Sequence, residues 1–297
     1  MTTVEHVPPR LIFAELRKVR TTNLWWILAL CGVGALALAL LVNGVQAYFE
    51  LDAVRNPSEG GSPFVTEGGL AGAQQTAAAR LFTSGSYFGQ LIVLVLGSLL
   101  VTNEFAHQTA TATFLTTPQR TRVILAKLWA GVGVAGAAWL ATTVINLIVG
   151  VIFFASIGEP NSLGEWSVLR SILMNLLAYA LWGVLGVGLG ALLKNQIAAT
   201  ITAAGGYLIG GQIIQGVFLV LYLLVVKQTW FLQLMVLAPS VASEVMVSAG
   251  RLPFGPSLDG GSAIFGPPWW VGALILVGYG VITGAVGAWL LRRRDIS

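Results

Sequence analysis

The stretch NEFAHQTATATFLTTPQR, residues 103–120, lies between two long apolar runs. It brings together a carboxylate at Glu104, an imidazole at His107, a ladder of threonine hydroxyls and a guanidinium at Arg120. The whole chain is 56% hydrophobic and only 9% charged. So many polar side chains in one short stretch therefore indicate a functional segment.

The catalytic patterns that such residue types suggest are missing. His6 and His107, the two histidines, are remote in sequence and lack Cys or carboxylate partners at metal-binding spacing, which argues against a zinc or iron site. No G-x-x-x-x-G-K-[ST] phosphate loop occurs, and no Ser-His-acid arrangement stands out. The sequence therefore predicts that this chain is not an enzyme and holds no cofactor of its own.

Composition and apolar runs predict an all-α integral membrane protein with one transmembrane domain over residues 1–297. The mean hydropathy is +0.82, too high for one soluble core. Runs without ionisable side chains reach the ~20 residues that cross ~30 Å of hydrocarbon as a helix. Six such spans are predicted, at about 24–45, 84–103, 130–154, 171–193, 198–226 and 269–291.

The distribution of Lys and Arg predicts the orientation. With a cytoplasmic N-terminus, the inner segments carry eleven of the 16 basic residues and the outer segments five. The positive-inside rule then places both termini in the cytoplasm and the protein in the cell membrane. The net charge of +4 reflects this bias, and no basic stripe with interleaved aromatics indicates nucleic-acid binding.

The segments outside the spans differ in character. Residues 10–22 place Ile12, Leu16 and Val19 on one helical face, with Glu15 on another, which predicts an amphipathic helix along the membrane; a solvated basic leader is the alternative. Residues 46–83 are predicted to be an exposed loop with short helical pieces such as 71–81. The apolar part of 227–268 is too short to cross, so an outer helical hairpin is predicted there instead of a seventh span.

Small residues and missing charges also restrict the function. Gly206 with Gly210, Gly280 with Gly284, and the run GVLGVGLG at 183–190 predict close helix packing, either inside the chain or between copies. The six predicted spans hold no ionisable side chain, whereas proton-coupled carriers place such groups at mid-membrane. If the protein transports actively, its energy is therefore expected to come from another subunit.

These features give residues 104–122 a position on the cytoplasmic side, between the second and third spans. Thr117 and Pro118 suit the N-cap and first position of the next helix, since a proline there loses no intrahelical hydrogen bond. A short helical turn is expected before Thr117, although TATATF also fits a strand in isolation. Glu104 as a simple helix cap, with the arginines as orientation signals only, remains an alternative.

The pattern resembles the membrane subunits of type-2 ATP-binding cassette (ABC) exporters. The matching residues are Glu104-Phe105, the threonine-rich stretch 109–117, Pro118-Gln119-Arg120 and Ala126-Lys127. The leader, which is similar to the family's elbow helix, the six spans, the hairpin before the last span and the terminal LRRRD extend the resemblance over nearly the whole chain. One departure is Gln108, where the family pattern has glycine.

The resemblance implies an exporter (efflux) subunit that pairs with a second membrane subunit, as a homodimer, and with a separate ABC ATPase that binds ATP and Mg. It implies that residues 104–122 form a coupling helix against that ATPase. The residues assigned to this contact are Glu104, Phe105, His107, Thr109, Thr113, Phe114 and Arg120.

The sequence leaves the cargo open. Five uncharged polar residues in the spans could line a path for an amphipathic or hydrophobic cargo, or could be interhelical hydrogen bonds: Gln90, Asn146, Asn175, Gln212 and Gln215. Two alternatives to an exporter are a passive channel or carrier and a membrane scaffold without transport. A passive channel or carrier would need no cytoplasmic docking element, and a scaffold reconstituted with its ATPase would show no cargo-stimulated hydrolysis.

Overall fold

The computed structural model describes residues 9–21, 24–56, 69–108, 120–193, 195–248 and 266–293, and the regular structure within these ranges is entirely helical. Six segments are long and apolar enough to cross a membrane. They are Leu24–Arg55, Gly69–Ala106, Arg122–Ser156, Trp166–Leu193, Gln196–Val226 and Trp269–Gly287. The chain is thus a multi-pass, all-α membrane protein, and the six predicted spans are confirmed as helices.

Each span is one helix or a series of helices joined end to end. The elements are α1 Pro9–Thr21, α2 Leu24–Arg55, α3 Gly69–Phe82, α4 Ser86–Ala106, α6 Arg120–Ser156, α7 Trp166–Leu193, α8 Gln196–Gly205, η1 Gly206–Gly210, α9 Gly211–Leu221, η2 Tyr222–Val226, α10 Thr229–Gln233, η3 Leu234–Leu237, α11 Pro239–Val247 and α12 Trp269–Arg293. Of the short elements, η1 and η2 are π-helical and η3 is a 3₁₀ helix.

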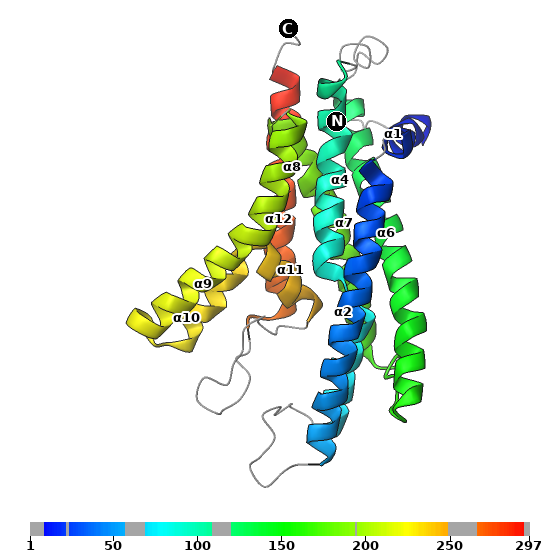
Figure 1. The fold of residues 1–297 in the computed structure, drawn as a ribbon. Helices are drawn as coiled ribbons and strands as arrows, with labels where there is room; N and C mark the ends of the chain where they lie inside the picture. Colours follow the sequence, from blue (N-terminus) through cyan, green and yellow to red (C-terminus); the bar gives the residue numbers. More distant parts are fainter. Residues whose placement is uncertain are drawn as a thin grey trace, which may run out of the picture.

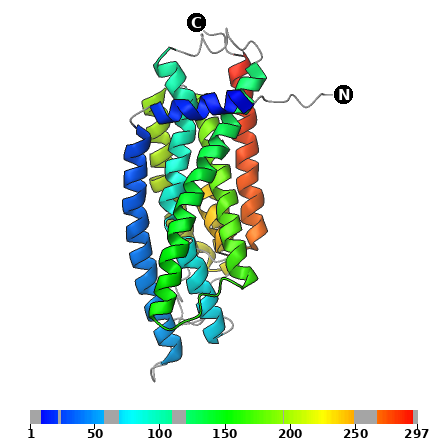
Figure 2. The same ribbon diagram turned by 90° about the vertical axis from the view of Figure 1, so that its right-hand side faces the viewer.

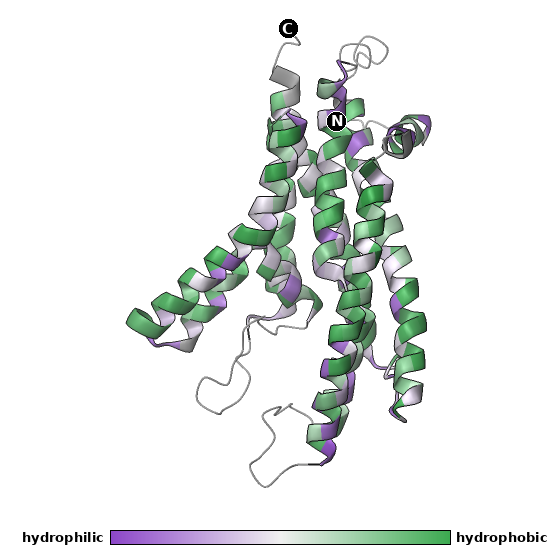
Figure 3. Ribbon diagram, viewed as in Figure 1, coloured by the Kyte–Doolittle hydropathy of each residue, from purple (hydrophilic) through white to green (hydrophobic). Residues whose placement is uncertain are grey.

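The long helices form a bundle that α1 crosses at one end. Figure 1 shows α4, α6, α7 and α12 running together, with α2 along one side and α9 leaning away. Figure 2 shows α1 lying crosswise over the end of the bundle that also holds the last turn of α12. We call this the α1 end and the other the opposite end. Hydrophobic residues cover most of the length of the long helices, and hydrophilic ones gather on α1 and at the far end of α2 (Figure 3).

The core of the bundle is the contact between α4 and α7. In the most apolar window of each span, 56% of the residues of α3–α4 and of α7 are buried, against 11% for α2 and for the α8–η2 series. A Cβ added to Gly186 would lie 2.3 Å from the Leu94 carbonyl oxygen, and one added to Gly97 would lie 2.6 Å from the Gly183 oxygen. The two helix backbones therefore touch, because only glycine leaves room for this approach.

The other glycine pairs are used differently. A Cβ at Gly206 or Gly210 would meet nothing within 4 Å, so this pair makes no close helix contact inside the chain. At Gly280 and Gly284 the nearest atoms are side-chain carbons 3.6 and 3.9 Å away, an ordinary contact distance. The run 183–190 thus supplies the closest packing, through Gly183, Gly186, Gly188 and Gly190.

Replacing Gly186 by alanine should destabilise the bundle. The new methyl group would overlap the backbone of α4, and backbone cannot yield as a flexible side chain does, so overpacking of at least ~1–3 kcal/mol is expected. The apparent melting temperature of the purified protein in detergent measures this. Gly278→Ala on α12 is the matched control, since its Cβ meets nothing within 4 Å. Equal melting temperatures for the two variants would contradict the α4–α7 contact.

At the opposite end, α3 is buried rather than exposed. The prediction of a helical piece at 71–81 is confirmed, but Ala73, Ala77 and Ala78 are fully covered, so the predicted exposed loop is wrong for this part. The alanines let α3 pack closely against α2, α6 and α7, and their small size hid this face in the hydropathy pattern.

Ion pairs tie the opposite end together across the chain. Arg80 on α3 pairs with buried Glu50 on α2, N–O 2.8 Å, and Arg55 of α2 pairs with Glu159 in the turn after α6. Gln74 of α3 also donates to Glu159, at 2.7 Å. These contacts join α2, α3 and the α6–α7 connection where the helices project beyond the apolar part of the bundle.

Two short helical arms follow η2, and we call them the hairpin. Residues Trp230–Leu237 and Pro239–Val247 are bent by 107° relative to each other, so the chain turns back at Pro239. Tyr279 of α12 donates a hydrogen bond to the Leu237 carbonyl, 3.0 Å, which fixes the tip of the hairpin against the bundle. The two arms also pack on α9 through Val236, Val241 and their neighbours.

Candidate functional site

Four charged side chains from three elements meet at the α1 end. Glu15 and Lys18 lie one turn apart on α1, Glu104 lies in the last turn of α4, and Lys127 lies two turns into α6. Glu104 begins, and Lys127 follows, the segment 104–122, which the resemblance to ABC exporters proposes as the coupling element. We call these four residues the charge cluster.

Lys127 is the centre of the charge cluster. Its ammonium nitrogen is 2.8 Å from Glu15 Oε2, 2.9 Å from Glu104 Oε1 and 2.9 Å from the Leu100 carbonyl oxygen. Its side chain is 3% exposed, and those of Glu15 and Glu104 are 3% and 5% exposed. Three donor–acceptor contacts match the three N–H groups of an ammonium, so the buried cation is fully satisfied.

Lys18 completes the charge balance from the rim of the cluster. Its nitrogen is 2.7 Å from Glu15 Oε1 and 2.6 Å from Glu104 Oε1. Burial on its own lowers the pKa of Lys18, but the hydrogen bonds to Glu104 and Glu15 outweigh it and raise the pKa above the usual value. The stabilisation is therefore complete below the normal lysine pKa and is lost only as the pH rises through the raised value, so Lys18 stays charged at neutral pH.

Apolar packing surrounds the charge cluster. Ile12 and Leu16 of α1 and Phe105 of α4 pack against buried Leu100, Val101 and Ile124. Glu15 lies on the same buried face of α1, although the helical pattern places it on another, because its carboxylate reaches Lys127. Position 15 is therefore a docking residue, which the sequence analysis missed. The two lysines were also missed, since no local pattern connects residues 15, 104 and 127.

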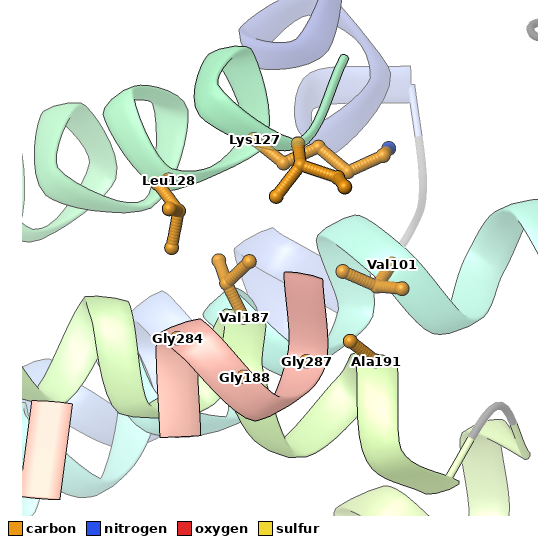
Figure 4. A pocket seen from close by; sticks show the side chains of 9 residues that line it. Val101, Lys127, Leu128, Val187, Gly188, Ala191, Gly284 and Gly287 are labelled. Atoms are coloured by element: carbon orange, nitrogen blue, oxygen red, sulfur yellow. The ribbon is translucent and has the colours of Figure 1, made fainter. Parts of the chain in front are cut away.

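A small hollow lies next to the cluster. It is lined by apolar and small residues of α4, α6, α7 and α12, and Figure 4 shows the stem of Lys127 along it with the ammonium nitrogen directed away. Its volume of about 10 Å³ holds about one water molecule. The hollow is thus too small for a cargo, and the site at the α1 end is built for contact between elements.

The structure describes only part of the proposed coupling set. Glu104 is in the charge cluster, Phe105 is half-buried against the apolar group that includes Leu100 and Val101, and His107 is exposed. Thr109, Thr113 and Phe114 lie outside the described residues, and so does the side chain of Arg120, whose backbone begins α6. Gln108 has a φ of 54°, the left-handed region that glycine adopts readily, at the position where the family pattern has glycine.

The five candidate cargo-path residues are divided among different places. Gln90 accepts a hydrogen bond from Tyr207 across α4 and η1, at 3.3 Å. Asn146 donates to the Phe82 and Ser84 carbonyls and so joins α6 to the α3–α4 turn.

The other three candidate cargo-path residues take no part in the hydrogen bonds of Gln90 and Asn146. The buried Asn175 on α7 leaves its Oδ1 without a hydrogen-bond partner. Gln212 is exposed on α9, and the Oε1 of buried Gln215 has no partner. Asn146 thus has a packing role, and Gln90 links α4 to η1.

No group of three or more His, Cys, Asp or Glu side chains that could hold a metal ion occurs within the described ranges. No curated protein matches the chain. The part of the chain that matches a family model includes Glu104 and Lys127 but begins after α1. The chain belongs to the family described as "Protein of unknown function (DUF2705)", which matches residues 37–297.

Proposed function

We propose that the chain is the membrane subunit of an ABC exporter, driven by ATP hydrolysis on a separate ATPase subunit. The observation that carries the proposal is the charge cluster, which fastens crosswise α1 to the two helices that border residues 104–122. A force applied to that segment acts at once on α4, α6 and α1. Such a rigid junction suits a part that receives motion from a partner.

The long helices carry that motion into the membrane. From the charge cluster, α4 and α6 run through the bundle, and α4 is in backbone contact with α7 at Gly97 and Gly186. Close-packed interfaces transmit displacements because they have little free volume to absorb them. A shift of residues 104–122 by the ATPase would therefore move α4, α6 and α7 together.

The same proposal fixes the orientation and the partners. The α1 end would face the cytoplasm of a cell membrane, as the basic residues predict, with α1 as an elbow helix along the membrane surface. ATP and Mg would bind the partner ATPase. A second copy of this chain would complete the transporter, and Gly206 with Gly210 is available for close contact with it.

Purification of the tagged chain from its own cells tests the proposal. An ATPase with a phosphate loop should co-purify in a constant ratio, and its hydrolysis should rise with cargo after reconstitution. The chain alone, freed of the ATPase, should bind no ATP. Transport that proceeds without nucleotide would favour the passive carrier. Stable purification without any ATPase would contradict the exporter assignment.

A further inference from the structure

Glu244 differs from the glutamates that the bundle uses for structure. Glu15, Glu50, Glu104 and Glu159 each pair with a lysine or an arginine. Glu244, in the middle of α11, is exposed and makes no hydrogen bond or ion pair through its side chain with any described residue. An exposed, unpaired carboxylate in an otherwise apolar hairpin is costly unless it has a ligand.

The position of α11 places Glu244 within the length of α12. The tip of the hairpin, Leu237, is bonded to Tyr279, which is ten residues or about 15 Å along α12 from its first residue. From there α11 runs back, and the Ala242 carbonyl lies 2.4 Å from where a Cβ of Gly272 would be. Glu244, two residues after Ala242, is therefore beside the first turns of the α12 span and not in a connecting loop.

A group of aromatic rings lies within electrostatic range of Glu244. Its charge acts on Tyr207 of η1, whose ring centroid is 4.9 Å from that of Tyr87 and 4.7 Å from that of Trp182. Tyr207 is buried and held by its hydrogen bond to Gln90, while Tyr87 is half-buried. Aromatic rings attract cations through their π-electron faces, so the rings and the carboxylate favour the same charge.

Unused acceptors continue from Glu244 along the α9–α11 contact. Ser240 is one turn before Glu244 on the same face of α11, and its hydroxyl oxygen has no hydrogen-bond partner. A Cβ at Gly211 of α9 would lie 2.5 Å from that oxygen, so the two helices meet there. One turn further along α9, Gln215 is 5% exposed and its Oε1 has no partner. The oxygen atoms of Ser240 and Gln215 could therefore each accept a hydrogen bond from a ligand.

We propose that Glu244, with Ser240 one turn before it, binds the ammonium group of a cationic amphiphile. The ammonium group would supply the positive charge and the N–H donors that these side chains lack. The apolar chain of the amphiphile would lie against the apolar surface of the hairpin. If the chain is an exporter, this group belongs to the cargo. The identification of the amphiphile as cargo rests on the proposed function, whereas the binding of an ammonium group at Glu244 does not depend on it.

Calorimetric titration of the purified chain with octylammonium, in a neutral maltoside detergent, tests the site. Glu244→Gln should lower the affinity about tenfold or more, because it removes the charge but keeps the shape. Glu165→Gln, at an exposed glutamate in the turn before α7, is the control and should leave the affinity unchanged. Octyl sulfate should not distinguish the variants. Equal octylammonium affinity for the native chain and Glu244→Gln would overturn the site.

The same titration separates a lipid from a free amphiphile as the source of the ammonium group. In nanodiscs of phosphatidylglycerol, octylammonium should bind as in detergent. A loss of affinity in nanodiscs that contain phosphatidylethanolamine would show that the lipid headgroup fills the site, and retention would identify a free amphiphile. No ATPase is present in these measurements, so their failure is distinct from failure of the exporter assignment.

Discussion

Replacing Lys127 by methionine is expected to release α1 from the bundle. The change leaves two buried carboxylates, Glu15 and Glu104, with only the half-exposed Lys18 as counter-charge. Breaking a buried ion pair by removing one partner costs about 3–5 kcal/mol. The six spans keep their own packing, so the cost falls on the docking of α1. Trypsin cleavage at Arg17 and Lys18 should accelerate at least a hundredfold, since 1.4 kcal/mol is about tenfold.

Two further variants make this result specific. Lys227→Met removes an exposed lysine between η2 and α10 and should leave the cleavage rate unchanged. Glu15→Gln combined with Lys127→Met removes one carboxylate together with the cation, and its cost should be smaller than the sum of the two single changes. A Lys127→Met protein that trypsin cleaves as slowly as the native chain would show that the cluster does not hold α1.

The double replacement Phe105→Ala and Phe114→Ala is expected to weaken the binding of the ATPase. A few aromatic anchors typically carry ~2 kcal/mol or more each at a docking interface, which corresponds to a loss of roughly thirtyfold per anchor. Phe105 packs on the same buried apolar group as Ile12 and Leu16 of α1, so its loss also loosens the junction with α1. Quantitative co-purification of the ATPase, scored against correctly inserted membrane protein, measures the change.

Phe88→Ala is the matched control, because Phe88 is a 40% exposed phenylalanine in the first turn of α4, at the end of that helix remote from Glu104. It should retain the ATPase. The single variants divide the effect: Phe105→Ala should accelerate trypsin cleavage of α1, and Phe114→Ala should not. Full ATPase binding and full transport by the double variant would leave residues 104–122 as a solvated connection.

The six spans were predictable because membrane crossing depends on a local property. A run such as 130–154 is apolar over the length that a membrane requires, whatever the rest of the chain does. The burial of α3 was not predictable in this way. Its covered face consists of Ala73, Ala77 and Ala78, which are too small to produce a strong hydropathy signal, and their partners come from three other helices.

The charge cluster was only half predictable. Glu104 was assigned to residues 104–122, whereas Lys127 entered only as part of the Ala126-Lys127 pair and its role was missed. Their link to Glu15 joins positions 112 residues apart, so it depends on how α1 crosses the bundle. Glu244 was overlooked for a similar reason, since its significance comes from Tyr207 and α12 and not from its neighbours in sequence.

Site-directed crosslinking tests the central claim, that the α1 end is where a separate ATPase docks. Cys31 is the single cysteine, so Cys31→Ser gives a cysteine-free background. In it, His107→Cys at the α1 end and Glu165→Cys at the opposite end place one exposed thiol at each end. With a short thiol-to-amine crosslinker, His107→Cys should form an adduct with the ATPase and Glu165→Cys should form none. No adduct at position 107, or equal adducts at both positions, would contradict the account.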